Sequence, residues 1–149
     1  HKKWDVFFAE ERIGWQLQLL AEKDIVLSDP EQLINLVKET LHNHHVLPSL
    51  LHGDFWRGNL GFVNNIPTLF DPACYYGDRE VDIAMSELYA PLPEDFYDTY
   101  KHHYPLAQGY EQRKLVYQLY PVLNNANIFA GHYLNQAKEH VDKLINLLD

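Results

Sequence analysis

"LHGDFWRGNLGFVNNIPTLFD", residues 51–71, places a polar motif beside a strand–turn–strand pattern. Two short apolar runs, Leu60–Val63 and Ile66–Phe70, are separated only by Asn64-Asn65. Because asparagine tolerates positive φ, this pattern predicts a β-hairpin closed by a tight turn. The hairpin interrupts a chain whose remaining apolar spacing is helical.

Three oxygen-bearing side chains flank the expected hairpin. Asp54 and Asn59 precede it, and Asp71 ends it. A hairpin fixes its two flanks relative to each other, so these side chains can converge into a site for a hard cation such as Mg²⁺. The structural alternative is that Asp54 and Asn59 cap local turns and Asp71 caps a helix start.

The rest of the chain predicts five or six helices. Asp29-Pro30 has the pattern of an N-cap followed by proline at the first helical position, and Pro121 should kink or end the helix that contains it. The fold class is therefore mainly α with a small β-hairpin, in a single domain over residues 1–149. Helical apolar spacing covers residues 4–21, about 30–43, 79–89, 94–103, 109–123 and 132–148.

Composition limits the possible partners. The net charge of the 149 residues is −9 and no basic patch is visible, so we expect neither nucleic acid nor an anionic membrane as a partner. Cys74 is the only cysteine, which fits a reducing, cytoplasmic location. No signal peptide or membrane-length apolar run is visible. The first residue is not Met, so we expect a piece of a longer protein.

The spacing His52-x-Asp54-x-x-x-x-Asn59 resembles the catalytic loop of protein kinases, with Gly53 where they have Arg. In that chemistry the Asp accepts the proton of the attacking hydroxyl, and the Asn coordinates magnesium. A second Asp, one hairpin later, holds magnesium against the nucleotide phosphates, and Asp71 stands at that place. The pattern therefore predicts phosphoryl transfer.

Longer motifs resemble one branch of that superfamily. H-G-D is typical of the aminoglycoside phosphotransferase and choline kinase branch. Within it, "LHGDFWRGN" (51–59), "FDPACYYGDREVDIAM" (70–85) and "WDVFFAEERIGWQLQLLA" (4–21) are similar to the fructosamine kinase, or ketosamine-3-kinase, family. The resemblance extends over nearly the whole chain. It implies ATP- and Mg²⁺-dependent phosphorylation of a sugar on a ketosamine or a glycated protein, as a repair of glycation.

The resemblance also assigns roles to residues. It implies that Asp54 is the catalytic base, that Asn59 and Asp71 are the magnesium ligands, and that Trp56 is the family's tryptophan. An indole two residues after the base is placed to stack on a sugar, and a core aromatic under the loop is the equal alternative. His52 is expected to support the loop as a hydrogen-bonding group rather than to carry a proton.

Some positions depart from the family pattern or surround its motifs. Phe55 and Arg57 stand where Leu and Ser are common, and Arg57 is expected to alter substrate preference. Arg79, with Glu80 and Asp82, is expected to form a charged network that holds the Asp71 segment. The alternative is that these three residues only form a solvated helix face.

No glycine-rich loop precedes the catalytic motif, and the upstream residues read as helical. The resemblance therefore implies the C-terminal lobe of a protein-kinase-like (α+β) fold, with the N-terminal ATP lobe absent from this chain. We expect the chain alone to be inactive. Two alternatives stay open, another small-molecule kinase of the same branch and a non-catalytic binding lobe.

Overall fold

The computed structural model describes residues 3–148, which fall into two compact units. The first, here the helical unit, comprises His1–His45 and Leu115–Asp149, and the second, the site-bearing unit, comprises Val46–Lys114. No helix in the described part of the chain is long and apolar enough to cross a membrane. The expectation of a single domain stays a prediction.

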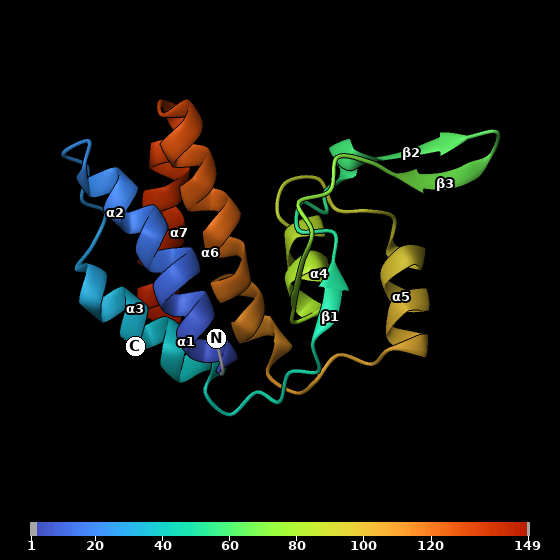
Figure 1. Ribbon diagram of the computed structural model, residues 1–149, viewed down its shortest axis with the longest axis horizontal. Helices are drawn as coiled ribbons and strands as arrows, with labels where there is room; N and C mark the ends of the chain where they lie inside the picture. Colours follow the sequence, from blue (N-terminus) through green and yellow to red (C-terminus); the bar gives the residue numbers. More distant parts are fainter. Residues whose placement is uncertain (1–2, 149) are drawn as a thin grey trace. The chain divides into compact units, whose positions relative to one another are not determined.

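The helical unit begins with one continuous helical segment (Figure 1). It consists of α1 (Trp4–Val6), a π-helical stretch η1 (Phe7–Gly14) and α2 (Trp15–Ala21). The sequence predicted this helix but not its π-helical middle. α3 (Pro30–Leu41) follows, and the Asp29 carboxylate accepts hydrogen bonds from the backbone N–H of Glu31 at 2.9 Å and of Gln32 at 3.5 Å. The predicted N-cap is confirmed.

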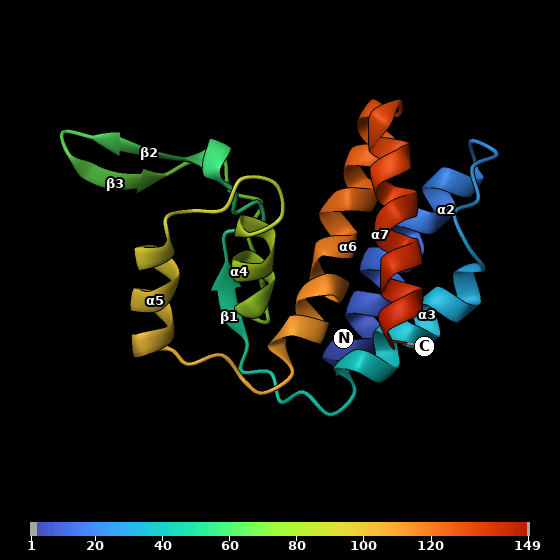
Figure 2. The same cartoon turned by 180° about the vertical axis from the view of Figure 1, so that it is seen from behind.

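Two long helices, α6 (Tyr110–Phe129) and α7 (His132–Leu148), lie side by side in both views (Figures 1 and 2). Pro121 was predicted to kink or end its helix; that it ends the helix is wrong, because α6 continues to Phe129, and a kink stays a prediction. Proline deprives the helix of one backbone donor. Its neighbours Leu119 and Leu123 are fully buried, and packing of that face stabilises the helix despite the lost hydrogen bond.

The core of the helical unit is almost entirely apolar. Tyr117 is its largest fully buried side chain, and it packs edge-on against Phe8 with ring centroids 5.1 Å apart. Its hydroxyl accepts a hydrogen bond from the Trp4 indole N–H at 3.0 Å, so the polar groups of both rings are hydrogen-bonded within this aromatic cluster. Other fully buried members are Ile13, Leu20, Leu33, Val37, Leu41, Leu119, Leu123, Val141 and Leu144.

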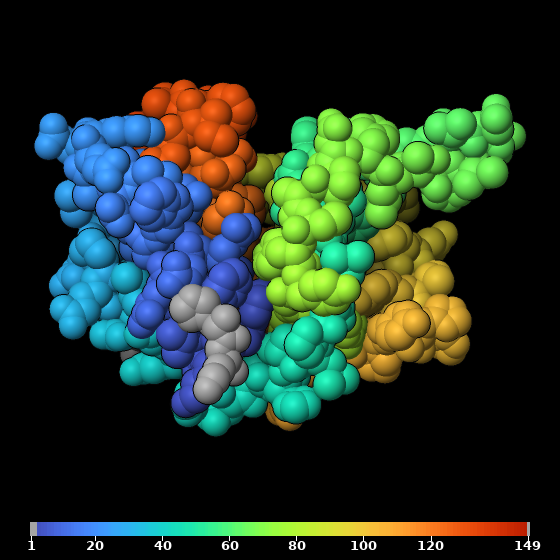
Figure 3. Space-filling view, in the orientation of Figure 1, coloured from blue at the N-terminus to red at the C-terminus, as the bar shows by residue number. Residues whose placement is uncertain are grey.

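The site-bearing unit contains the predicted hairpin. Strands β2 (Leu60–Val63) and β3 (Ile66–Leu69) pair antiparallel, with Leu60 opposite Leu69 and Val63 opposite Ile66. Asn64 and Asn65 have φ values of 50° and 63°, as the tight turn requires. The hairpin extends away from the rest of its unit (Figure 3).

A second small sheet was not predicted. β1 (Ser49–Leu51) and β4 (Tyr75–Gly77) pair antiparallel, with Ser49 opposite Gly77. Strands of three residues are too short for an alternating pattern to reveal them. This sheet brackets the motif, because β1 leads into His52 and β4 follows the Asp71 segment. The expected mainly α fold class is confirmed with this addition.

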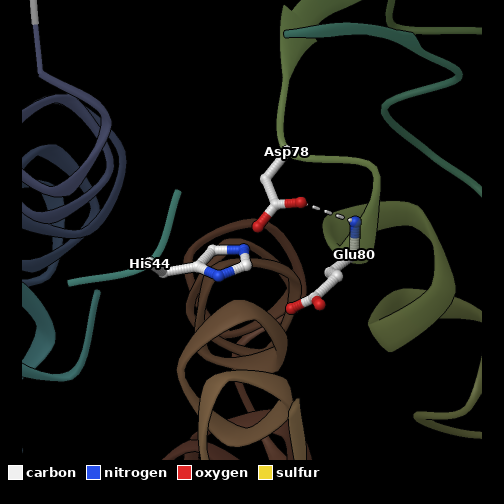
Figure 4. A group of neighbouring side chains, drawn as sticks. All are labelled: His44, Asp78 and Glu80. Atoms are coloured by element: carbon white, nitrogen blue, oxygen red, sulfur yellow. Dashed lines mark hydrogen bonds between the residues drawn. The ribbon is translucent and has the colours of Figure 1, made fainter. Parts of the chain in front are cut away.

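Three short helices lie wholly within the site-bearing unit, which also contains the first residues of α6, up to Lys114. They are the one-turn 3₁₀ helix η2 (Arg57–Asn59), α4 (Glu80–Ser86) and α5 (Glu94–His103). The Asp78 carboxylate accepts a hydrogen bond from the Glu80 backbone N–H at 3.1 Å at the start of α4 (Figure 4). α4 ends three residues earlier than its predicted end near residue 89.

Candidate active site

A carboxylate of α4 fixes the start of the motif loop. Asp82 accepts hydrogen bonds from the backbone N–H of His52 at 2.7 Å and of Gly53 at 3.0 Å, one with each carboxylate oxygen. Burial raises the pKa of the Asp82 carboxyl, and these two donors act in the opposite direction. The expectation that Asp82 holds the Asp71 segment is therefore corrected: it holds the His52-Gly53 backbone.

The His52 ring links the loop to the end of the hairpin. Its Nδ1 accepts a hydrogen bond from the Asp54 backbone N–H at 3.3 Å, and its Nε2 lies 3.0 Å from the Phe70 carbonyl oxygen. A backbone N–H can only donate and a carbonyl can only accept, so this pair of contacts selects the neutral ring with its proton on Nε2. Both ring nitrogens are thus used to hold backbone groups, which agrees with a supporting role for His52.

Backbone hydrogen bonds attach the Asp71 segment to the motif loop on both sides of Asp71. Phe70 N–H donates to the Asn59 carbonyl at 3.1 Å, and Ala73 N–H donates to the His52 carbonyl at 2.8 Å. Asp71 has φ of 52°, a left-handed conformation that aspartate tolerates better than most residues, and its side chain is exposed. The two flanks of the hairpin are thus held together, as the sequence suggested.

Gly53 makes this close approach possible. Its φ is 79°, and a Cβ atom at this position would lie 2.0 Å from the Ala73 carbonyl oxygen. Any other residue would force the Asp71 segment away from the loop. Glycine in the H-G-D motif therefore has a steric reason.

Asp54 and Asn59 contact each other directly. The Asn59 Nδ2 group donates to Asp54 Oδ2 at 2.8 Å and to the Asp54 carbonyl at 3.0 Å. Both amide hydrogens are used in this way, so Oδ1 is the Asn59 atom left to face a cation. Asn59 is only 6% exposed, whereas Asp54 is half-buried. The same two hydrogen bonds also close the loop between Asp54 and Asn59. The alternative prediction, that these residues cap a local turn, therefore describes part of what Asn59 does.

The aromatic residues of the loop separate into a core residue and a surface residue. Trp56 is 43% exposed, which excludes the core alternative for it. The aromatic under the loop is Phe55, which is 8% exposed and packs between His52 and Phe96 with both ring centroids 6.0 Å away. Arg57 is exposed beside Trp56, and its effect on substrate preference stays a prediction.

The expected network around Arg79 is corrected. The Arg79 guanidinium donates to the Tyr100 hydroxyl at 3.0 Å and to the carbonyls of Tyr104 at 3.1 Å and Pro105 at 2.6 Å. It therefore holds the carboxyl end of α5, where cations satisfy carbonyls that a helix leaves unbonded, rather than the Asp71 segment.

Glu80, the remaining member of the expected charged network, forms a buried ion pair with Arg113. Its carboxylate accepts two hydrogen bonds from Arg113, at 2.7 and 2.9 Å, and one from the Ala107 N–H at 3.3 Å. Both side chains of this ion pair are more than nine-tenths buried. Sequence analysis missed Arg113, and the available signal was a glutamate on the apolar side of a short helix, which requires a buried cation.

Comparison with known proteins agrees with the motif. The family model described as fructosamine kinase matches residues 1–147. A protein of Vibrio parahaemolyticus named "Probable ketoamine kinase" is 53% identical over 146 residues, which cover 98% of this chain and 51% of that protein. An Escherichia coli K12 protein of the same name is 44% identical over 144 residues, covering 97% of this chain and 50% of that protein.

One solved structure is closely similar. The crystal structure of "Putative fructosamine-3-kinase" from Haemophilus somnus 129PT matches with a TM-score of 0.92 at 39% identity, over 97% of this chain and 50% of that one. The protein-kinase-like fold class is thereby confirmed. The chain spans about half the length of the curated relatives it matches.

Proposed function

Because the chain belongs to the fructosamine kinase family, we propose that the full-length protein containing it transfers a phosphoryl group from ATP to a sugar hydroxyl of a ketosamine. The acceptor is a fructosamine or ribulosamine adduct of a small amine or a protein, and the biological role is repair of glycation. The observation that carries the proposal is the direct Asp54–Asn59 contact in a loop bonded to the Asp71 segment. Residues 1–149 form the C-terminal catalytic and substrate lobe of a cytoplasmic enzyme.

Asp54 is the proposed general base. Its carboxylate accepts from the Asn59 amide, which fixes its orientation and leaves its second oxygen to receive the proton of the acceptor hydroxyl. In phosphoryl transfer the base is needed late, so an ordinary carboxylate at the right place is sufficient. Positioning by the loop is therefore the main contribution of this chain.

Asn59 and Asp71 are the proposed magnesium ligands. Amide and carboxylate oxygens are what Mg²⁺ prefers, and the cation needs only one or two protein carboxylates when nucleotide phosphates supply further oxygens. Asn59 Oδ1 and the exposed Asp71 carboxylate fit this donor set. When bound, magnesium neutralises the charge of the ATP phosphates. Trp56 is proposed to stack on the sugar, since it is exposed two residues after the base.

The test uses this chain fused at its N-terminus to the part of the Vibrio parahaemolyticus relative that it does not match. The fusion is assayed for ATP-dependent phosphorylation of a fructosamine, choline and an aminoglycoside. We expect transfer to the fructosamine. Transfer only to choline or the aminoglycoside would make it another small-molecule kinase of this branch, and no transfer to any of the three would support a non-catalytic lobe.

The 149-residue chain alone should fold but show negligible transfer. Residues 3–148 contain no strand-rich lobe to cover the nucleotide, and effective molarity collapses when the γ-phosphate is not held in line with the acceptor. A cooperative melt and an ATP assay on the purified chain check both halves of this expectation. Robust turnover would contradict it.

A further inference from the structure

The backbone conformation at position 58 does not explain why glycine stands there. It lies in the middle of η2, the single turn that Trp56 begins and Asn59 ends, and Asn59 N–H donates to the Trp56 carbonyl at 2.9 Å. Gly53, by contrast, has a left-handed φ and a backbone oxygen against it. Gly58 is exposed and does not have a left-handed φ, so the main-chain conformation alone would allow any side chain at this position.

The Trp56 indole excludes that side chain. A Cβ atom on Gly58 would lie 2.1 Å from Cη2, 2.3 Å from Cζ2 and 2.6 Å from Cζ3 of Trp56. These are three successive atoms of the six-membered ring. An approach to the ring edge would bring one atom close and leave its neighbours much farther away, so the similar distances place Gly58 over the ring face. One face of the indole thus rests on the loop backbone.

We propose that Gly58 is a positioning residue that holds the Trp56 indole flat on the loop and so presents its other face to the sugar of the ketosamine. This inference rests on the proposed function, in which Trp56 stacks on that sugar. The backbone of Trp56 is tied to the base, because its N–H donates to the Asp54 carbonyl at 3.2 Å. A ring held at one orientation relative to Asp54 loses less freedom when substrate binds.

Gly58→Ala should therefore act on sugar binding. The added methyl group displaces the indole, so KM for the fructosamine should rise roughly two- to tenfold, the range expected for one aromatic stacking contact. The bonds of Asn59 to Asp54 do not involve Gly58, so kcat should fall by less than KM rises. KM for ATP should stay close to the parent value.

The matched control is Gly61→Ala in the same loop–hairpin segment. A Cβ atom on Gly61 would meet only the Phe70 ring, at 3.3 Å, and would not approach Trp56. In the fusion protein labelled with 5-fluorotryptophan, the Trp56 resonance is assigned by its loss in Trp56→Phe. Gly58→Ala should shift this ¹⁹F resonance, and Gly61→Ala should leave it in place.

A double variant separates positioning from a general defect. Phenylalanine at position 56 lacks the ring atoms that meet the Cβ, so Gly58→Ala should raise KM little further in the Trp56→Phe background. If Gly58→Ala alone fails to give a cooperative melt, the double variant should restore it. An equal KM increase in both backgrounds, an unfolded double variant or an unshifted Trp56 resonance would overturn the inference while leaving the proposed function intact. A normal fructosamine KM in Trp56→Ala would overturn the stacking role itself.

Discussion

The two compact units use buried polar groups in different ways. In the helical unit the interior is mainly apolar, and the buried carboxylate of Asp5 accepts a hydrogen bond from the adjacent Val6 backbone N–H at 2.9 Å and lies 3.0 Å from the His42 ring. In the site-bearing unit the carboxylates of Asp82 and Glu80 accept hydrogen bonds from backbone N–H groups far away in the sequence, those of His52 and Ala107. These two carboxylates of the second unit therefore fix main-chain segments that lie far from them in the sequence.

This difference follows from what each unit must do. Apolar burial is non-directional, so it keeps helices together without specifying where a loop atom lies. Hydrogen bonds depend on distance and angle, so they can hold a short irregular loop in one geometry. A site made of loop residues needs the second kind of interaction, and a bundle of helices needs mainly the first.

The largest effect should come from the carboxylate at the centre of the site. Asp54→Asn in the fusion protein should lower kcat by roughly two to four orders of magnitude, because general-base assistance is lost. KM for ATP should change little, since Asp54 is proposed to meet the acceptor hydroxyl. Asp98→Asn, an exposed residue of α5, is the control. Near-parental turnover in Asp54→Asn would remove Asp54 from its role.

The next effect concerns the buried ion pair of the site-bearing unit. Arg113→Met leaves the Glu80 carboxylate, with a side chain 2% exposed, without its cation, and should reduce the free energy of unfolding by about 3–5 kcal/mol. The control is Lys38→Met in the helical unit, whose pair with Glu10 is solvent-accessible and should cost about 0–1 kcal/mol. Urea denaturation measures both. Equal losses of unfolding free energy in the two variants would contradict the expectation that the buried ion pair contributes more to stability than the exposed one.

In the helical unit the sensitive positions should be apolar. Leu33→Ala removes a fully buried side chain of α3 and should cost about 2–5 kcal/mol of unfolding free energy. Phe62→Ala on the hairpin, where the side chain is 69% exposed, should change stability by less than about 0.5 kcal/mol in the 149-residue chain. A larger loss of unfolding free energy for Phe62→Ala in the same urea measurement would mean that the Phe62 side chain packs against another part of the chain.

The smallest effect is a pH dependence in the helical unit. Burial lowers the pKa of His140 from 6.5, and its Nε2 lies 2.8 Å from the Leu115 carbonyl. As the pH falls through 6.5, His140 becomes protonated in the unfolded chain but stays neutral in the folded chain. The free energy of unfolding therefore falls, by at most about 1.4 kcal/mol per pH unit. His140→Gln should flatten this slope between about pH 7.5 and the lowered pKa, in urea denaturation measured at a series of pH values.

Local features of the chain were readable because their causes lie within a few residues. Asn64-Asn65 supplies the positive φ values of the turn, and Asp29 reaches the N–H groups of the next turn of chain. The spacing of Asp54, Asn59 and Asp71 indicated a shared site because a hairpin brings its own ends together. Helical periodicity located the helices for the same reason, since each pattern repeats within every turn.

Tertiary structure decided which distant groups meet. β1 and β4 are three-residue strands far apart in sequence, and their pairing depends on the fold that surrounds them. Asp82 holds a loop thirty residues earlier, and Arg79 holds the end of α5 rather than the Asp71 segment. Trp56 lies on the surface while its neighbour Phe55 is buried, and Phe55 packs against Phe96, which is distant in the sequence. Preferences of φ and side-chain periodicity are local, but a hydrogen bond or a buried contact needs a partner that only the folded chain brings into reach.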